Sequence, residues 1–257
     1  MAKSVWLALL AACLSPQQAF AAADLAQLSN STPAAHRQAG PSTAGSDSVA
    51  VQAAKRPDFE RASASQDARN LADWVLASGD NHGMPFVIVD KKSAKVFVFN
   101  PDGRLRGASP ALLGLTPGDD VVPGIGNRKL STIRPEERIT PAGRFVADLG
   151  HELHGEEILW VDYDDSIAMH RVITTNPKER RAQRLATPTP SDNRISYGCI
   201  NVPARFYDRV VSPAFTGTSG IVYVLPEILS PRRVFAAYGA YERMRAQVAS
   251  ADKGAGR

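Results

Sequence analysis

The stretch that decides the fold class is Pro85-Phe86-Val87-Ile88-Val89-Asp90-Lys91-Lys92-Ser93-Ala94-Lys95-Val96-Phe97-Val98-Phe99. It holds two short runs of β-branched and aromatic residues, at 86–90 and 95–99, joined by a polar turn. Such runs are typical of β-strands, because their side chains pack well on a pleated surface. The sequence therefore predicts a pair of strands at the start of a β domain.

The same criteria predict further strands downstream. Asn100-Pro101-Asp102-Gly103 is a strong turn sequence before a possible third strand at 104–109, and a long Gly- and Pro-rich passage follows. Other strands are predicted after Thr140, at 157–161, at 166–170 and at 221–225, the middle two alternating like antiparallel strands. We expect a mainly β domain over residues 85–228, of sandwich or barrel-like form with a few peripheral helices.

Helices are predicted on either side of this domain and once within it. Asp58 to Ser78 has helical periodicity that Gly79 ends, which defines a helical extension over 57–84. Pro203 starts a helix that runs to Val211. A basic amphipathic helix from Ser230 to Val248 begins the terminal segment 229–257, and its arginines form a solubilising face or attract an anionic polymer.

Composition gives broad limits on function. The 257 residues are 44% hydrophobic and 22% charged, as in an ordinary globular protein. A net charge of +4 and a pI near 9.2 are too mildly basic to indicate a nucleic-acid partner. The chain also has no phosphate-cradling glycine loop and no interleaving of aromatic and basic residues, so we predict no nucleic-acid partner.

The first residues have the features of an export signal. Lys3 precedes a short apolar run, and Ala19-Phe20-Ala21 matches a cleavage site, which predicts a signal peptide over 1–23 and a periplasmic protein. The apolar run is too short for a stable membrane span. A second interpretation is a lipoprotein box ending in Cys13. Residues 24–56 are rich in small polar residues and are predicted to be a disordered linker.

Cys199 is the second of the two cysteines and has no internal partner once the leader is removed. A lone thiol in an exported protein is a candidate reactive group, although a free cysteine can also be a small core residue. As a nucleophile it needs a base, for which His170 is suited, and oxyanion donors, which the amides of Tyr197, Gly198 and Cys199 can supply. Because the histidine comes first, a papain-type protease is disfavoured.

The sequence Ser196-Tyr197-Gly198-Cys199-Ile200-Asn201, with His170 and the Thr140–Phe145 stretch before it, resembles the L,D-transpeptidase (YkuD-type) catalytic domain from about Pro85 to Glu227. The resemblance implies a YkuD-like fold, Cys199 as nucleophile and His170 as general base. It also implies that Ser196 and Asn201 support the site, that no cofactor is needed, and that donor and acceptor are peptidoglycan stem peptides.

Two positions and one loop depart from the family pattern. Tyr197 stands where the family has histidine, and Arg171 stands where glycine is common. The loop between His170 and Ser196 is longer than usual and strongly basic, ending near Arg194. It is either a solvated surface loop or a lid that recognises carboxylates, since arginine pairs with them bidentately. Arg171, Arg194 and Tyr197 are therefore candidate substrate-binding residues.

The resemblance implies acyl transfer through a cysteine acyl-enzyme, at either of two L-to-D bonds of a stem peptide. The products are 3-3 crosslinks between diaminopimelate residues or 1-3 crosslinks from L-Ala to diaminopimelate. The alternatives are an L,D-carboxypeptidase or endopeptidase, in which water takes the acyl group, and a non-catalytic wall-binding module.

Two other polar clusters carry weaker predictions. His151-Glu152-Leu153-His154 lacks the histidine spacing of a zinc helix, so no metal is predicted. Asp162, Asp164 and Asp165 fall in a predicted hairpin and are expected to be solvated.

Overall fold

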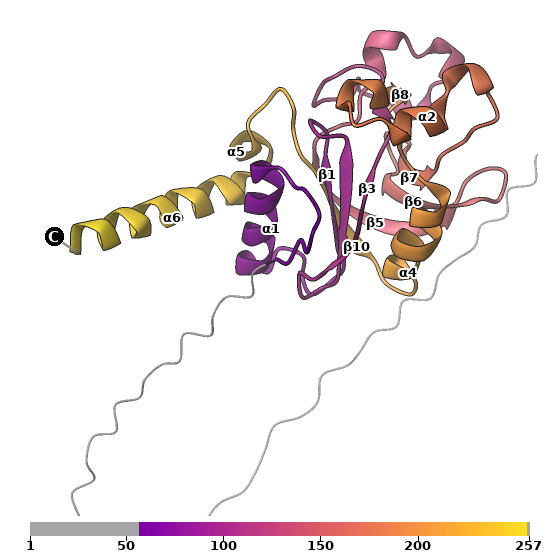
Figure 1. Cartoon of the computed structure of the whole chain (residues 1–257). Helices are drawn as coiled ribbons and strands as arrows, with labels where there is room; N and C mark the ends of the chain where they lie inside the picture. Colours follow the sequence, from indigo (N-terminus) through magenta and orange to yellow (C-terminus); the bar gives the residue numbers. More distant parts are fainter. Residues whose placement is uncertain (1–56, 256–257) are drawn as a thin grey trace, which may run out of the picture. The chain divides into compact units, whose positions relative to one another are not determined.

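A computed structural model describes residues 57–255 (Figure 1). The predicted signal peptide, its lipoprotein alternative at Cys13 and the predicted linker at 24–56 lie outside the described residues. Among the helices of the described part, none has the length and apolar character needed to cross a membrane.

The fold is built on one eight-stranded sheet with the strand order β3-β2-β1-β10-β5-β6-β7-β9. Its strands are β1 (Phe86–Asp90), β2 (Lys95–Phe99), β3 (Leu105–Pro110), β5 (Gly143–His151), β6 (Glu157–Asp162), β7 (Ile167–Arg171), β9 (Ile200–Val202) and β10 (Gly220–Val224). The β1–β10 and β7–β9 pairs are parallel, and the other pairs are antiparallel. The predicted mainly β class is confirmed, including the antiparallel pairing of β6 with β7.

The sheet curls until its two ends almost meet. Leu112, just beyond β3, forms an isolated bridge with Asn201 of β9, and each residue's N–H donates to the other's carbonyl, at 2.8 and 2.9 Å. The result is a nearly closed, barrel-like sheet.

Both faces of the first strands are covered, which explains their uniformly apolar sequences. Val87 and Val89 of β1 point into the core enclosed by the sheet. Phe86 and Ile88 alternate with them and pack in a second core, against α1 (Gln66–Ser78) and the start of α6 (Ala236–Ala255). In Figure 1, α1 and α5 (Pro231–Val234) lie on the side of the sheet where β1 is labelled.

The first helix is shorter than its sequence periodicity predicts. It begins at Gln66, where the Ser65 side chain accepts from the Ala68 N–H, and it ends at Gly79 in the left-handed conformation. Upstream, Asp58 bridges to Arg104, and Phe59 packs edge-on against two phenylalanine rings of β2. Tertiary packing of Phe59 therefore holds residues 58–64 out of the helix.

The remaining helices follow the predictions with adjusted bounds. The helix after Pro203 is confirmed and continues past Val211, as α3 (Ala204–Phe206), a π-helical turn (η6, Tyr207–Val211) and α4 (Ser212–Phe215). The C-terminal helix is split into α5 and α6 at Phe235, whose buried side chain joins the second core.

Three short strands were missed, and two of them flank Cys199. They are β4 (Leu113–Gly114), β8 (Arg194–Ser196) and β9. β4 pairs with β8 in a separate small sheet. Strands of two or three residues are too short to show an alternating pattern, so periodicity does not detect them.

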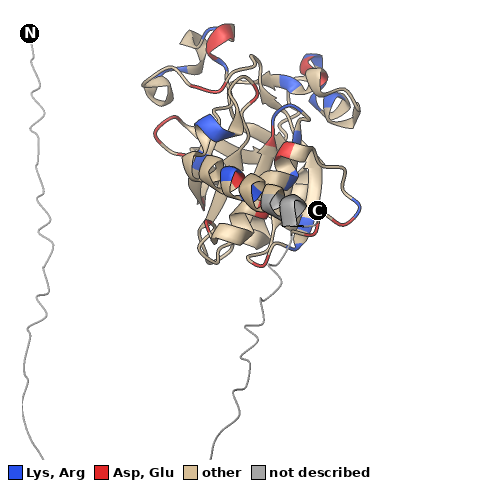
Figure 2. Cartoon of the chain, turned by 90° about the vertical axis from the view of Figure 1, so that its left-hand side faces the viewer, with Lys and Arg blue, Asp and Glu red and all other residues tan. Residues whose placement is uncertain are grey.

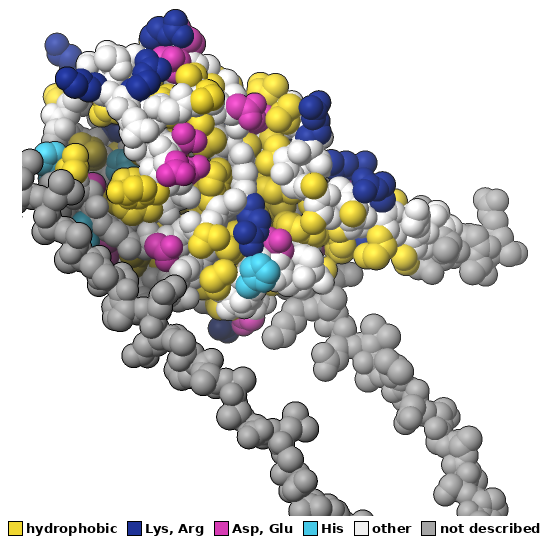
Figure 3. All heavy atoms as spheres, turned by 180° about the vertical axis from the view of Figure 1, so that it is seen from behind, with side chains coloured by type: hydrophobic (Ala, Val, Ile, Leu, Met, Phe, Trp, Pro, Cys, Tyr) yellow, Lys and Arg dark blue, Asp and Glu magenta, His cyan; other side chains and the backbone are white. Residues whose placement is uncertain are grey.

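The surface carries charged side chains of both signs together with hydrophobic ones. Lys and Arg are interspersed with Asp and Glu in the view of Figure 2, and hydrophobic side chains are interspersed with charged ones on the face seen in Figure 3. The four predicted surface arginines of the C-terminal helices, at 232, 233, 243 and 245, are exposed.

Candidate active site

The turn that carries Cys199 is fixed by its own hydrogen bonds. The Ser196 hydroxyl donates to the carbonyl of Cys199 at 2.6 Å and accepts from the N–H of Gly198 at 3.1 Å. Thr140 Oγ1 donates to the Gly198 carbonyl at 2.7 Å from the opposite side. Ser196, which the family resemblance implies as a supporting residue, therefore closes this turn through two hydrogen bonds.

Gly198 is required by both conformation and space. Its φ is 135°, and an added Cβ would lie 2.8 Å from the carbonyl oxygen of Ile139 and 2.8 Å from Ile167 Cδ1. Only glycine accommodates this close approach without displacing the neighbouring backbone.

The parallel pairing of β7 with β9 places His170 on the same face as the thiol. His170 is the register partner of Asn201, and Met169 is the partner of Ile200. Because side chains alternate along strands, His170, Asn201 and Cys199 project from one face, with His170 and Cys199 on diagonal positions. Two residues that are far apart in the sequence therefore project from the same face of neighbouring strands.

The hydrogen bonds of the imidazole define its tautomer. Nδ1 lies 2.8 Å from the carbonyl oxygen of Arg171, which can only accept, so Nδ1 carries the hydrogen. Nε2 lies 3.2 Å from Nδ2 of Asn201 and accepts from it. The single lone pair of neutral His170 is therefore on Nε2, where it accepts the hydrogen bond from Asn201.

Burial keeps both groups neutral in the resting site. It raises the pKa of the Cys199 thiol, against the opposing effects of the Ala168 N–H and the charge of Arg181. Burial also lowers the pKa of His170, although the Arg171 carbonyl acts to raise it. Both shifts favour a thiol and a neutral imidazole over a preformed ion pair.

Asn201 joins these groups and is fully buried. Its Nδ2 also donates to the carbonyl of Cys199, at 3.3 Å, while its Oδ1 accepts from Arg181 Nη1 at 2.6 Å. Asn201 was predicted as a supporting residue. Arg181 was predicted only as one member of the basic loop, and nothing in the local sequence distinguishes it from the arginines around it.

The thiol opens into a small pocket of about 70 Å³, called the thiol pocket below. Cys199 Sγ lies 3.6 Å from the carbonyl oxygen of Ser166. The pocket is covered by residues 121–139, the cap segment, whose 3₁₀ turns are η1 (Ile125–Asn127), η2 (Leu130–Thr132) and η3 (Pro135–Glu137). Tyr197 also lines this pocket, which brings the residue that replaces the family histidine next to the thiol.

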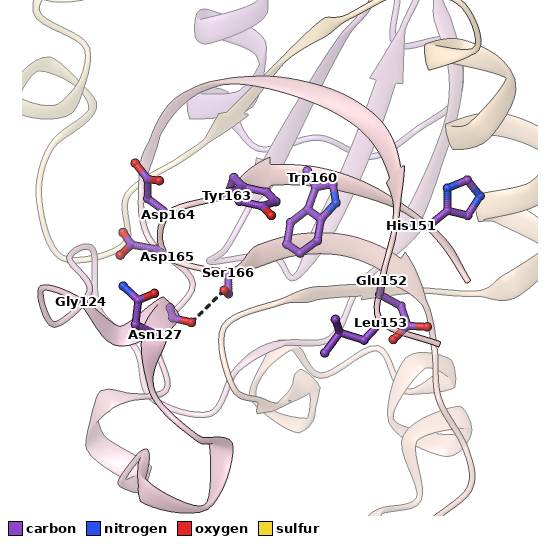
Figure 4. A pocket seen from close by; sticks show the side chains of 11 residues that line it. Gly124, Asn127, His151, Glu152, Leu153, Trp160, Tyr163, Asp164, Asp165 and Ser166 are labelled. Carbon is purple, nitrogen blue, oxygen red and sulfur yellow. Dashed lines mark hydrogen bonds between the residues drawn. The ribbon is translucent and has the colours of Figure 1, made fainter. Parts of the chain in front are cut away.

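A larger groove of about 680 Å³ adjoins the thiol pocket and shares Gly126, Asp165 and Ser166 with it. Figure 4 shows Trp160 and Tyr163 along one side of the groove and Glu152 and Leu153 at its far end. The Trp160 and Tyr163 rings pack edge-on with centroids 5.0 Å apart. The groove therefore has an aromatic surface and adjoins the thiol pocket at the residues that the two share.

The polar clusters that the sequence singled out contribute to this groove. His151 and Glu152 line one end, in the β5–β6 hairpin, while Asp164 and Asp165 line the other. Asp164 is exposed, as predicted, whereas Asp165 is partly buried. Burial, together with the neighbouring Asp162 and Asp164, raises the pKa of Asp165.

The cap segment is organised around the buried carboxylate of Glu137. Arg128 donates to both of its oxygens, at 2.9 and 3.2 Å, and the N–H of Arg134 donates at 2.8 Å. These contacts hold the pKa of Glu137 at about 2. Next to it, the Arg138 guanidinium lies 3.9 Å from the centre of the Tyr197 ring, a cation–π contact that ties the cap segment to the motif.

Arg171 and Arg194, the other two candidate substrate-binding residues, already have protein partners. Arg171 donates to Asp208 at 2.8 Å and to the Glu157 carbonyl at 2.9 Å. Arg194 pairs with Glu227 and donates to the Lys91 carbonyl at 3.0 Å. Neither lines the groove or the thiol pocket, so their placement favours a structural role.

The amides predicted as oxyanion donors divide into two kinds. The N–H of Gly198 is already taken by the Ser196 hydroxyl. The amides of Tyr197 and Cys199 are therefore the two candidates that remain to donate to a developing oxyanion.

Comparisons with known proteins give a partial structural likeness. The structure is similar to an L,D-transpeptidase from Xylanimonas cellulosilytica (14% identity, TM-score 0.35), covering 55% of this chain and 60% of that one. It is also similar to an L,D-transpeptidase from Mycobacterium tuberculosis (14%, 0.33, covering 55% and 57%). A third similar structure is the helical cell shape determining protein Pgp2 from Campylobacter jejuni (12%, 0.38, covering 57% and 49%).

The first matched structures are each covered over less than two thirds of their length, by 58%, 49% and 60%. By sequence, the chain matches no protein-family model and no curated protein. The function below is therefore argued from the site itself.

Proposed function

We propose that the protein is a peptidoglycan L,D-transpeptidase that works through an acyl-enzyme on Cys199. The observation that carries the proposal is the arrangement on the β7–β9 pair, where His170 bonds through Nε2 to Asn201 beside the thiol-bearing turn. The thiol opens into a pocket that adjoins a peptide-sized groove. The resemblance of the motif to the family supports the same reaction.

The chemistry follows from the protonation states. The Asn201 amide releases Nε2 of His170, which takes the proton of the Cys199 thiol as sulfur attacks the carbonyl of an L-residue. Charge therefore does not build up on sulfur before attack. The carbonyl oxygen becomes an oxyanion, which the amides of Tyr197 and Cys199 stabilise. The imidazolium then gives its proton to the departing amine of the D-residue, which leaves a thioester on Cys199.

The groove suits the second substrate. The acceptor attacks the thioester with an amine, and a stem peptide carries this amine as an ammonium ion before it is deprotonated. Glu152, Asp164 and Asp165 line the groove, and none of its lining residues within the described chain is Lys or Arg. A cationic acceptor is therefore favoured over an anionic one in the groove.

The bond that is cleaved is either that between diaminopimelate and terminal D-Ala or that between L-Ala and D-Glu. Tyr197 lines the thiol pocket and is stacked against Arg138. It therefore stands where it can contact the residues on either side of the scissile bond. We propose that this residue, together with the cap segment, sets the choice between 3-3 and 1-3 crosslinks.

The test is product analysis with the purified protein. It is incubated with tetrapeptide and pentapeptide stems, and the products and the protein are read by mass spectrometry. We expect an acyl adduct on the peptide that contains Cys199, followed by crosslinked dimers, and neither product with Cys199→Ala. Undiminished crosslinking by Cys199→Ala would overturn the mechanism.

The same experiment separates the rival functions. Shortened stems without dimers identify a carboxypeptidase, because water then takes the acyl group. Absence of any adduct or product, with binding retained, identifies a wall-binding module. A periplasmic location is part of the proposal, since peptidoglycan lies outside the inner membrane, and it is tested by fractionation.

A pH profile follows from the state of His170. The base must be neutral to accept a proton, and burial lowers its pKa from the usual 6.5. We therefore expect the acid limb of kcat/KM to lie below pH 6.5, because activity falls only as His170 becomes protonated. An acid limb above pH 6.5 would contradict His170 as this base.

A further inference from the structure

The long loop (residues 172–193) contributes one side chain to the interior of the site. Arg181 opens α2 (Arg181–Ala186), and its side chain is only 14% exposed. Its Nη1 donates to Oδ1 of Asn201 at 2.6 Å, and its Nε donates to Glu179 of the preceding turn. The guanidinium is therefore held at both ends, by a carboxylate of its own loop and by the amide beside His170.

The contact determines which way the Asn201 amide faces. A guanidinium can only donate, so the amide oxygen must point to Arg181 and the NH₂ group must point to His170. Nε2 of His170 must then accept, which places the ring hydrogen on Nδ1, opposite the Arg171 carbonyl. Arg181 thus supports, through an intervening amide, the same tautomer that the Arg171 carbonyl selects.

We infer that Arg181 is a positioning residue for the acyl transfer proposed above: it orients the Asn201 amide that faces Nε2 of His170 and so helps to hold the imidazole in its Nδ1–H tautomer. The inference rests on the proposed function for its role in the reaction, but the geometry it depends on is independent of the substrate.

The electrostatic setting is consistent with this role. Arg181 lowers the pKa of His170 and the pKa of Cys199, whereas Glu156 and Glu152, in the β5–β6 turn, act to raise that of His170. Protonation of Nε2 would place an N–H against the NH₂ of Asn201. This donor–donor repulsion favours passing the proton on to the departing amine, which restores the neutral ring.

The test compares three variants of the full chain. Arg181→Met removes the charge and the hydrogen bonds. Arg181→Lys keeps the charge but not the planar pair of donors. Lys178→Met is the matched control, because Lys178 is an exposed cation of the same loop whose side chain makes no contact with the site residues.

Two readouts need no peptidoglycan. One is the pH dependence of alkylation of Cys199 by iodoacetamide, followed by mass spectrometry of its own peptide so that Cys13 does not interfere. The other is the tautomer and pKa of His170 from imidazole nitrogen and carbon chemical shifts. Because neither depends on turnover, they distinguish failure of this inference from failure of the proposed function.

For Arg181→Met we expect alkylation at pH 7 to slow by roughly fivefold, as the thiolate fraction falls. We also expect the His170 pKa to rise and the Nε2–H tautomer to become populated beside the Nδ1–H form, because the Asn201 amide is then free to turn its oxygen to Nε2. Arg181→Lys should recover most of the alkylation rate but not the wild-type tautomer of His170. Lys178→Met should match the wild type in both the alkylation rate and the tautomer. A wild-type tautomer and alkylation profile in folded Arg181→Met, or an Arg181→Lys variant as slow as Arg181→Met, would overturn the inference.

Discussion

Single residues determine whether the thiol is presented at all, and Gly198 is the clearest case. Its positive φ and the 2.8 Å approach of the Ile139 carbonyl oxygen leave no room for a side chain. The sequence indicates this glycine only as the residue before the thiol and as a candidate oxyanion donor. Only the structure identifies Ile139, from the end of the cap segment, as the group that approaches it.

We predict that Gly198→Ala destabilises the fold by about 2–3 kcal/mol, because it adds backbone strain to a clash. The matched control is Gly217→Ala, which has a φ of +74° but no atom within 4 Å of an added Cβ. It should cost only about 1 kcal/mol. Chemical denaturation of both variants measures the difference, and equal losses would mean that the contact with Ile139 is unimportant.

Tyr197 raises a question of side-chain chemistry. Its ring stacks against Arg138 and lines the thiol pocket, so the ring and the hydroxyl can have separate roles. We predict that Tyr197→Phe, which keeps the cation–π contact, retains kcat/KM within about threefold. Tyr197→His, the family residue, should retain partial activity. Complete loss in both variants would assign the phenol hydroxyl an essential role.

At the scale of elements, the cap segment depends on Glu137. We predict that Glu137→Gln lowers the Tm and exposes residues 121–139 to limited proteolysis, because Arg128 and Arg134 lose their shared carboxylate. Glu136→Gln is the matched control, since that carboxylate is 61% exposed and contacts only the side chain of Arg134, at 3.3 Å. Equal sensitivity of the two variants would argue against Glu137 as the organising group.

The lowered pKa of Glu137 determines how its contribution to stability changes with pH. Glu137 has a pKa of about 2 in the fold against an ordinary 4.5, so folding favours the ionised form. Its stabilisation is fully present above about pH 4.5 and is lost as the pH falls towards 2. The Tm difference between wild type and Glu137→Gln should therefore shrink below pH 4.5; a constant difference down to pH 2 would contradict this account.

Over the whole molecule, one buried charge network joins segments that are distant in sequence. Lys91 follows β1 and is fully buried, with its ammonium 2.9 Å from Asp119 and 3.7 Å from Glu227. It also donates to the carbonyl of Thr140, at 2.9 Å. Glu227 in turn pairs with Arg194 at the start of β8. The network thus joins Asp119 and Thr140, which flank the cap segment, to Lys91 at the end of β1.

The pKa values show how this network is balanced. Burial lowers the pKa of Lys91, although the hydrogen bond and charge of Asp119 act to raise it. Burial acts to raise the pKa of Asp119, but the backbone N–H groups of Leu229 and Glu227, together with Lys91, lower it overall. Each charge is therefore tolerated only because its partners are present.

We predict that Lys91→Met destabilises the protein by about 3–5 kcal/mol, because it leaves buried carboxylates without a cation. Lys92→Met is the matched control, since the neighbouring lysine is 51% exposed and lies 3.6 Å from Asp67. Its loss should cost less than about 1 kcal/mol. Urea denaturation distinguishes the two, and a small loss in Lys91→Met would show that the network contributes little.

The sequence by itself determined the local features: the apolar strands, the capped helices, and a motif with a thiol, a glycine and a supporting serine. These depend on side-chain periodicity and on the conformations that single residues permit, which a short window contains. Tertiary structure alone decided the β7–β9 pairing that brings His170 to Asn201, the contact of Arg181 with that amide, and the structural partners of Arg171 and Arg194. Such contacts depend on which distant segments the closing sheet brings together. Arginines in similar local sequences therefore differ in the partners that their side chains contact.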